Sequence, residues 1–563
     1  MDYKKNGNYY ATEVNCLDGS TYDEDVCTYF ELDKIIKKIP ENPEKDELVL
    51  KFIVNNTNKE VRIKLVELAD QKVIKSKLLS KSFWMKYGDE GEFFSILSDK
   101  LKELIDSDVY DYEHKCLGWQ KFNDKWLFLY DSKVIENNHV STCVRKTGNF
   151  VSGNESEYDK LLGKYVLNNK YMLLAYVLGF TSIVNARISN SSDTGVMFVG
   201  ISGISSTGKS TALKLIASIY GDPDLVKGTL ILKNASSEVG RENQKAGLFG
   251  IPILLDDVNV GFKGDLSDYI YRIASGEPRT IAKPDGDVDT SRMGFSGLAI
   301  STSELSLYEY SNKNSGIYAR FIDLNGIIWT TDGTSATEIK KIISKNYGFK
   351  GKRFGEFIET YDDDQLTNIH EEAVAKIRSQ LKVTDNYTDR VLNQYGSIIA
   401  TLRLVNLCFN LTINEDEIID ILVKNEVELV QKRNIAQSSY ESVYEYYVTN
   451  KSSFVNCLKR EGYAWEKSYK GVAMYDAENN TTTLLIPIKT LKKILKELDY
   501  KQPDICIESW INKGYLMHEK GRKDCSNQAL GRHYKIVYHN NDFDTKNHNS
   551  EIKEVDIDDN NSN

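Results

Sequence analysis

Proline is scarce in this sequence, with 8 among 563 residues, and the 8 cysteines are scattered. No CxxC pair occurs and no group of cysteine and histidine has zinc-ligand spacing, which argues against a zinc finger or ribbon. The N-terminal stretch MDYKKNGNYYATEVN lacks the apolar segment of a signal peptide, and no window approaches 18 uninterrupted apolar residues. We therefore expect a reduced, cytoplasmic protein with no membrane partner.

The chain also lacks an excess of positive charge, since 72 Lys and Arg face 82 Asp and Glu, a formal net charge of -10. Nucleic-acid binding needs clustered Lys and Arg, so the total argues against it. The distribution of charge along the chain does not argue against it. Residues 541–563 hold seven acidic and two basic side chains and are expected to be a disordered tail, whereas residues 489–540 hold eleven basic and six acidic ones. A globally acidic chain can thus carry a local basic module.

The length exceeds what one hydrophobic core supports, so several domains are expected. The hydrophobic patterns predict an N-terminal α+β domain at 1–150, a helical linker at 151–190, an α/β core at 191–335, a helical lid at 336–440, a winged-helix-like domain at 441–540 and the acidic tail at 541–563.

The central segment alternates short apolar runs with helical patterns, which is typical of a parallel α/β sheet with helices on both faces. Its predicted strands are VMFVGIS, TLILK, GIPILLDD and FSGLAIST. In the C-terminal segment, IKTLKKILKELDY and PDICIESWINKGYL predict two short amphipathic helices before a hairpin at 516–538. Two helices followed by a two-stranded wing is the layout of a winged helix.

A phosphate-binding loop is predicted where residues 203–210, GISSTGKS, match GxxxxGK[ST] between a strand and a helix. Backbone N–H groups and the helix N-terminus would bind the phosphates of ATP, Lys209 would reach the β and γ oxygens, and Ser210 would ligate Mg²⁺. The expected nucleotide-binding residues are Gly203, Ser205, Ser206, Thr207, Gly208, Lys209, Ser210 and Thr211.

A pair of acids ends the strand pattern GIPILLDDVN. Asp256 would hold the magnesium through water, and Asp257 would orient or deprotonate the attacking water. The alternative is an acidic turn after a buried strand. The usual second acid is Glu, so Asp257 is one methylene shorter, and fast or slow hydrolysis both remain open.

At this point the residues resemble a known group, the AAA+ ATPases of phages and mobile elements that are related to the minichromosome maintenance (MCM) helicases. Staphylococcal pathogenicity islands and cassette chromosomes carry them as self-loading replicative helicases. The resemblance spans roughly residues 47–410 and rests on LGWQKF, GISSTGKSTALKLIASIYGDP, ILLDD, ASGEPRTIAKPDG, AISTSE and GIYARFIDL. It implies an AAA+ core that works as a ring, with a hexamer as the expected assembly.

The resemblance also implies roles for single residues. Lys283, in the hairpin pattern PRTIAKPDGDVDTSR, matches the lysine that grips single-stranded DNA in the pore of such rings; the alternative is a solvated hairpin lysine. Ser303, or Thr302 beside it, would be sensor 1 and face the γ-phosphate. Arg320 would be a finger that completes the neighbouring subunit's site, or else a surface arginine. Arg390 would be sensor 2, with Arg403 as its competitor.

The C-terminal segment has its own case for DNA binding. Its second helix could enter the major groove, and a set of basic residues would line the wing over the phosphates: Lys520, Arg522, Lys523 and Arg532. The alternative is a small domain that contacts protein. In island initiators of this kind the C-terminal part recognises the double-stranded origin.

The leading hypothesis is therefore an ATP-driven, self-loading DNA helicase that also initiates replication of a mobile element. A second hypothesis is an ATP-switched origin-binding protein that leaves unwinding to a host helicase. A third is an AAA+ ATPase that acts on protein, for example in phage defence.

Overall fold

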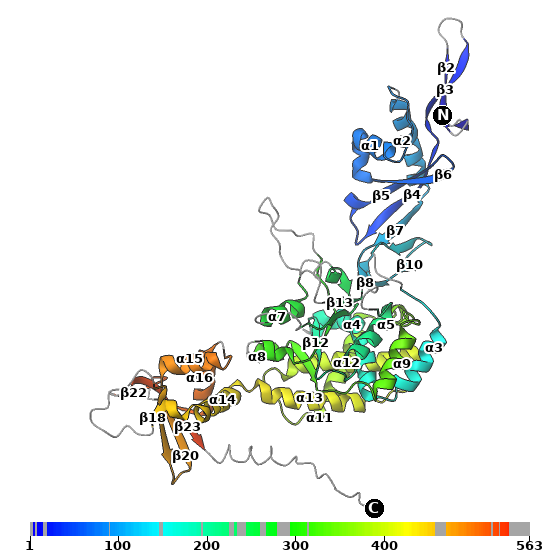
Figure 1. The fold of residues 1–563 in the computed structure, drawn as a ribbon. Helices are drawn as coiled ribbons and strands as arrows, with labels where there is room; N and C mark the ends of the chain where they lie inside the picture. Colours follow the sequence, from blue (N-terminus) through cyan, green and yellow to red (C-terminus); the bar gives the residue numbers. More distant parts are fainter. Residues whose placement is uncertain are drawn as a thin grey trace, which may run out of the picture.

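Three bodies follow one another in the computed structural model: an N-terminal domain, a helix-rich central body and a C-terminal domain at the opposite end (Figure 1). The structure describes residues 4–5, 8–14, 20–88, 90–145, 150–192, 195–224, 230–233, 244–258, 266–277, 293–311, 315–455, 469–500, 502–518, 522–527 and 530–539. The predicted acidic tail lies outside the described residues.

The N-terminal domain is built on a mixed sheet of strand order β10-β11-β7-β4-β5-β6. Its elements are β1 (Lys4–Lys5), β2 (Asn8–Val14), β3 (Thr21–Thr28), β4 (Phe30–Ile39), β5 (Glu47–Val54), β6 (Thr57–Lys64), α1 (Gln71–Leu79), α2 (Glu90–Asp106), β7 (Tyr110–His114), β10 (Ser132–Val134) and β11 (Val140–Cys143). β5 and β6 form an antiparallel pair, which a turn at Asn55 and Asn56 joins with φ of 49° and 57°. α2 is amphipathic and buries Phe93, Leu97 and Leu104.

A short sheet joins this part of the chain to the central body. β8 (Leu117–Phe122) pairs with β9 (Lys125–Leu129) and also with β14 (Leu248–Phe249), which lies far along the chain. Gly118 has φ of +91°, and a Cβ there would lie 1.8 Å from the carbonyl oxygen of Phe249, so only glycine fits. This segment, expected in the N-terminal domain, therefore packs in the hydrophobic cluster of the central body.

The central sheet is wholly parallel, in the order β13-β15-β16-β12-β17. Its strands are β12 (Met197–Ser202), β13 (Ile231–Lys233), β15 (Ile253–Asp256), β16 (Leu298–Ser303) and β17 (Phe321–Asn325). The four predicted strands are confirmed, and β17, which directly follows Arg320, is the fifth. Residues of β12 alternate between two hydrophobic clusters, Val199 and Ile201 on one face and Phe198 on the other, so both faces are covered.

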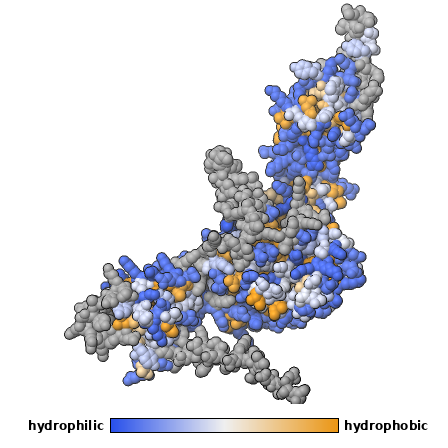
Figure 2. All heavy atoms as spheres, viewed as in Figure 1, coloured by the Kyte–Doolittle hydropathy of each residue, from blue (hydrophilic) through white to orange (hydrophobic). Residues whose placement is uncertain are grey.

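Helices pack on both faces of this sheet. α4 (Lys170–Ser192) and α5 (Lys209–Tyr220) contact one face, and α7 (Ser267–Ser275) contacts the other. α4 is long and apolar enough to cross a membrane by composition, but 89% of its stretch Lys170–Ser189 is buried inside the protein, as in a core helix. On the face drawn in Figure 2, apolar atoms form separate patches among hydrophilic ones rather than a continuous band.

An arginine near the end of α4 ties three segments together. The Arg187 guanidinium lies 4.8 Å from the ring of Trp119 and 5.3 Å from that of Trp126, and it pairs with Asp363 at 2.6 Å. Trp119 in turn donates to the carbonyl of Ile183 at 2.8 Å. β8, β9, α4 and the first turn of α11 are thereby held against one another.

The predicted helical region is confirmed and forms the rest of the central body. Its helices are α3 (Glu155–Leu161), α8 (Ser315–Tyr318), α9 (Gly333–Ile343), α10 (Gly351–Ile358), α11 (Asp363–Gln380), α12 (Thr388–Phe409) and α13 (Asp416–Arg433), with a π-helical turn at Leu162–Val166. α12 contacts α4, α11 and α13. α13 ends at Arg433, and the next helix packs in the hydrophobic cluster of the C-terminal domain instead.

The C-terminal domain combines three helices with a sheet of its own. Its elements are α14 (Ile435–Thr449), β18 (Phe454–Val455), β19 (Gly471–Asp476), β20 (Thr481–Pro487), α15 (Ile488–Glu497), α16 (Pro503–Lys513), β21 (Leu516–Met517), β22 (Cys525–Asn527) and β23 (Gly531–His539). The two predicted helices are confirmed as α15 and α16, and the predicted hairpin as the antiparallel pair β21 and β23. β18, β19 and β20 were not predicted.

Candidate nucleotide-binding site

The phosphate-binding loop lies where β12 ends and α5 begins, at the carboxyl edge of the parallel sheet. Gly203, Ser206 and Gly208 have φ of +143°, +68° and +91°, so the loop turns sharply and its N–H groups can point inward. A Cβ on Gly208 would lie 2.7 Å from the hydroxyl of Thr330, and Trp329 donates its backbone N–H to Thr207 at 2.8 Å. The segment after β17 thus packs against the loop and holds it in place.

Lys209, in the first turn of α5, is only 8% exposed. Its Nζ donates to the carbonyls of Gly203 at 2.7 Å and Ile204 at 2.8 Å, so the ammonium lies across the loop. Ser210 beside it is exposed, whereas Thr211 is buried and its hydroxyl has no hydrogen-bond partner among the described residues. Backbone N–H groups, an ammonium and a helix N-terminus that converge in this way can bind a triphosphate.

The predicted acid pair follows β15 at the same edge. The Thr302 hydroxyl donates to Asp256 at 2.8 Å and accepts from the backbone N–H of Asp257 at 3.0 Å, so β16 holds both acids. Asp257 has a left-handed φ of 49°, a conformation that non-glycine residues adopt rarely and at functional sites often. Burial raises the pKa of the Asp257 carboxyl, with a further rise from Asp256 and an opposing effect from Lys209.

Mg²⁺ prefers oxygen ligands and retains several waters. The Ser210 hydroxyl and the Asp256 carboxylate are such ligands, and the described residues contain no cluster of three or more acidic, cysteine or histidine side chains that could hold a metal alone. The residues present therefore fit a magnesium ion that arrives with a phosphate-bearing ligand rather than one bound by the protein alone.

The two sensor 1 candidates have other partners. Ser303 is fully buried and its hydroxyl donates to the carbonyl of Leu305 at 2.7 Å, while the Thr302 hydroxyl is hydrogen-bonded to both residues of the acid pair. The next residue, Glu304, reaches the phosphate loop and accepts a hydrogen bond from the Ser205 hydroxyl at 2.7 Å. Sequence reasoning missed Glu304, although it ends the motif AISTSE on which the resemblance rests.

Arg320 lies at the far edge of the sheet from the loop. It directly precedes β17, and because β17 runs parallel to β12, the start of β17 lies beside the start of β12. Its Nη1 donates to the carbonyl of Gly316 at 2.9 Å, and its guanidinium lies 4.8 Å from the Tyr271 ring. Arg320 is therefore not brought to the phosphate loop of its own chain.

Arg390 lies at the same far edge, in the first turn of α12. One turn later Gln394 donates to the carbonyl of Ala319 at 3.3 Å, which places this end of α12 beside the start of β17. The competing Arg403 is committed to a two-pronged ion pair with Glu415, at 2.7 and 3.0 Å. Of the two sensor 2 candidates, Arg390 is the one on the end of α12 that contacts the segment before β17.

The predicted DNA-binding residues are described only in part. Lys283 and Lys520 lie outside the described residues. Arg522 is exposed, Lys523 pairs with Glu508 of α16 at 2.5 Å, and Arg532 pairs with Asp524 at 2.5 Å. Sequence reasoning passed over a stripe of exposed lysines at helical spacing on α15: Lys489, Lys493 and Lys496.

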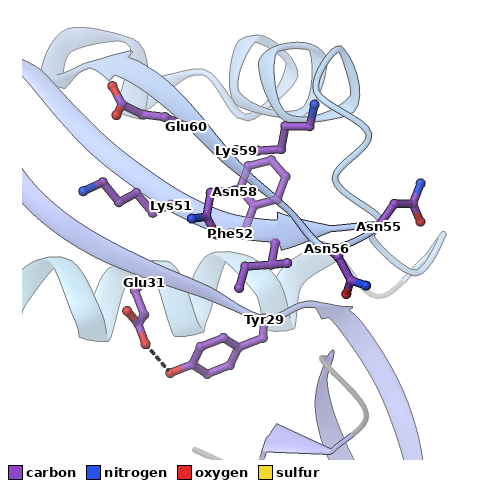
Figure 3. A pocket seen from close by; sticks show the side chains of 10 residues that line it. Tyr29, Glu31, Lys51, Phe52, Asn55, Asn56, Asn58, Lys59 and Glu60 are labelled. Atoms are coloured by element: carbon purple, nitrogen blue, oxygen red, sulfur yellow. Dashed lines mark hydrogen bonds between the residues drawn. The ribbon is translucent and has the colours of Figure 1, made fainter.

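A separate cavity of 680 Å³ lies in the N-terminal domain, between the ends of β4, β5 and β6 (Figure 3). Tyr29 donates to Glu31 at 2.9 Å on one wall, and Lys51 and Glu60 extend from the neighbouring strands. Its lining contains both lysines and glutamates, so charges of one sign do not gather there. The cavity belongs to the N-terminal domain and is therefore separate from the phosphate loop.

A parallel sheet with a phosphate loop and an acid pair at one edge defines a P-loop α/β core. A family model described as a domain of unknown function (DUF927) matches residues 36–293. The comparison with curated proteins gives no match. Among solved structures, one described as "SCCmec type IV Cch - active helicase" has a TM-score of 0.73 at 18% identity, over 95% of this chain and 98% of that chain. The chain thus shares a fold with that helicase over nearly its whole length.

Proposed function

We propose that this protein is a ring-forming AAA+ ATPase of the MCM-like type, which spends ATP to translocate on DNA and open it at the origin of a mobile element. The observation that carries the proposal is the division of the catalytic parts between two edges of one sheet. The phosphate loop and the acid pair lie at one edge, and Arg320 and Arg390 lie at the other. The shared fold with a protein described as an active helicase supports it.

Each residue has a defined task in this proposal. The loop N–H groups and Lys209 bind the phosphates, and Ser210 and Asp256 hold the magnesium, which neutralises charge on the phosphate oxygens when bound. Asp257 accepts the proton of the attacking water. In a head-to-tail ring, Arg320 of one copy meets the phosphate loop of the next, so that hydrolysis depends on assembly.

DNA contacts complete the proposal. Lys283 grips single-stranded DNA in the central pore, and the C-terminal domain binds the double-stranded origin. There, Lys489, Lys493 and Lys496 of α15 add phosphate contacts, because Lys493 is only loosely paired with Glu497 at 3.7 Å, whereas Lys523 and Arg532 pair with acids at 2.5 Å. The shared fold and the exposed basic stripe support this assignment.

ATP turnover and strand separation on forked DNA test the central claim. Lys209→Ala should abolish both while leaving origin binding intact, and Lys214→Ala, on the same helix beyond the loop, should change neither. A purified wild-type protein that separates no strands under any loading condition would contradict the proposal.

Duplex binding tests the claim about the C-terminal domain. Replacing the three α15 lysines together by Glu should weaken binding and lower the slope of log K against log salt by about 2.7, since each lost phosphate contact removes about 0.9. Lys451→Glu, exposed in the same domain, is the matched control. An unchanged slope would exclude α15 from the contact.

An ATP-switched origin-binding protein is the second candidate, and the short side chain of Asp257 favours it. It predicts turnover that single-stranded DNA does not stimulate, with unwinding only when a host helicase is added. The helicase proposal predicts stimulation by single strands without an added helicase. An ATPase that acts on protein would retain its DNA affinity and its DNA response when Lys283 is replaced by Ala.

A further inference from the structure

Glu304 follows the strand that lies between the two halves of the nucleotide site. β16 pairs with β12 on one side, where Ser303 is opposite Ser202, and with β15 on the other, where Ser301 is opposite Leu255. Residues that leave the carboxyl end of β16 therefore emerge between the phosphate loop and the acid pair. Glu304 is the first of them.

The side chains at the carboxyl end of β16 each have different hydrogen-bond partners. Thr302 bonds to Asp256 and to the backbone of Asp257, and Ser303 bonds to Leu305, so neither hydroxyl is directed at the loop. Glu304 is exposed and accepts from the Ser205 hydroxyl at 2.7 Å. Glu304 therefore contacts the loop, and its charge also raises the pKa of the Asp257 carboxyl.

Ser205 belongs to the first half of the loop. The Lys209 ammonium, which reaches the β and γ oxygens, lies against the carbonyls of Gly203 and Ile204 next to it, so this half of the loop faces the γ-phosphate and the water that attacks it. A carboxylate attached there is badly placed to bind the phosphate, because like charges repel. It is well placed to accept a hydrogen bond from the water.

We propose that Glu304 is a catalytic residue for ATP hydrolysis that orients the attacking water together with Asp257. This rests on the proposed ATPase function. The water oxygen bonds to the γ-phosphorus as the bond from that phosphorus to the β–γ bridging oxygen breaks, and ADP keeps the electron pair. One water proton passes to Asp257, while the other water hydrogen is held by Glu304. The second carboxylate compensates for the shorter side chain of Asp257.

Steady-state ATP turnover and direct binding of a fluorescent ATP analogue test this on the full chain. Glu304→Gln keeps an oxygen that can accept from Ser205 but removes the charge. It should lower kcat by about 10²-fold, the lower end of what a positioned acid or base contributes, because the water is no longer oriented for proton transfer to Asp257, with nucleotide affinity unchanged or tighter. Glu304→Asp should recover part of the rate. Glu309→Gln, an exposed acid five residues along, is the control and should match wild type.

Each outcome decides a different claim. A wild-type protein that hydrolyses no ATP overturns the proposed function and this role with it. An active wild type with Glu304→Gln within about threefold of its kcat overturns the role of Glu304 alone. Loss of nucleotide affinity in parallel with the rate would mean that Glu304 only shapes the loop, and it also overturns the role.

Discussion

Mixing two inactive variants tests whether each nucleotide site is shared between subunits. β17 has five residues at about 3.3 Å each, so its ends lie about 13 Å apart. Arg320 precedes this strand and packs over Tyr271, away from the loop of its own chain. Arg320→Ala should therefore lower kcat by about 10³-fold or more by removing charge stabilisation from the neighbouring site. Lys209→Ala should be inactive because its own loop no longer binds the triphosphate productively.

In a ring mixed from equal amounts of the two variants, a site works when its own chain has Lys209 and its neighbour has Arg320. Random assembly meets both conditions at about a quarter of the sites, so ATP turnover should recover to about a quarter of wild type. Mixing Lys209→Ala with the double variant is the control, because no chain in it has Lys209. Arg320→Ala with wild-type turnover, or mixtures that recover nothing although both variants assemble and Arg320→Ala binds nucleotide, would refute the reasoning.

Three further predictions concern the fold around the site. Gly208→Ala should cost about 1–3 kcal/mol locally and abolish measurable binding of a fluorescent ATP analogue, because φ is +91° and the Cβ would meet Thr330; wild-type affinity would contradict this. Arg187→Ala should lower the free energy of unfolding in urea by about 2–3 kcal/mol, because it removes two ring contacts. Arg353→Ala, which removes only an exposed ion pair with Glu155, should lower it by less than about 1 kcal/mol, and equal losses in the two variants would exclude the stacking argument. Burial holds the pKa of His114 below its usual value, so the unfolded chain binds the proton more tightly and stability falls as pH drops below about 6.5, by up to about 1.4 kcal/mol per unit. His114→Gln should flatten that fall in a thermal melt, and an unchanged slope would place the proton elsewhere.

The phosphate loop could be predicted because its signal is continuous along the chain. A strand, two glycines at fixed spacing and a helix are contiguous in GISSTGKS, and the acids directly end a buried run. The signal for β17 is weaker, because Asp323 interrupts its short apolar run. In the fold that acid is buried and accepts from the Ser202 hydroxyl at 2.7 Å, a contact between strands that no local pattern contains.

The remaining parts of the site depend on contacts between distant segments. Glu304 is 99 residues from Ser205, and the support of Thr207 by Trp329 spans a similar separation. The sequence placed Arg320 and Arg390 in motifs, but only the strand order puts them at one edge and the loop at the other. In the C-terminal domain, the wing lysine and arginine were predicted from composition, which cannot show that Glu508 and Asp524 neutralise them.

The pairing of β8 with β14 determines where the chain can be cut. A fragment that begins after residue 150, where composition changes, would leave the β8-facing edge of β14 unpaired and remove Trp119 from its bond to Ile183. It would also uncover the apolar surface of α4 that β8 contacts. A fragment that begins just before Leu117 keeps all three contacts, so it should stay monodisperse where the shorter fragment aggregates.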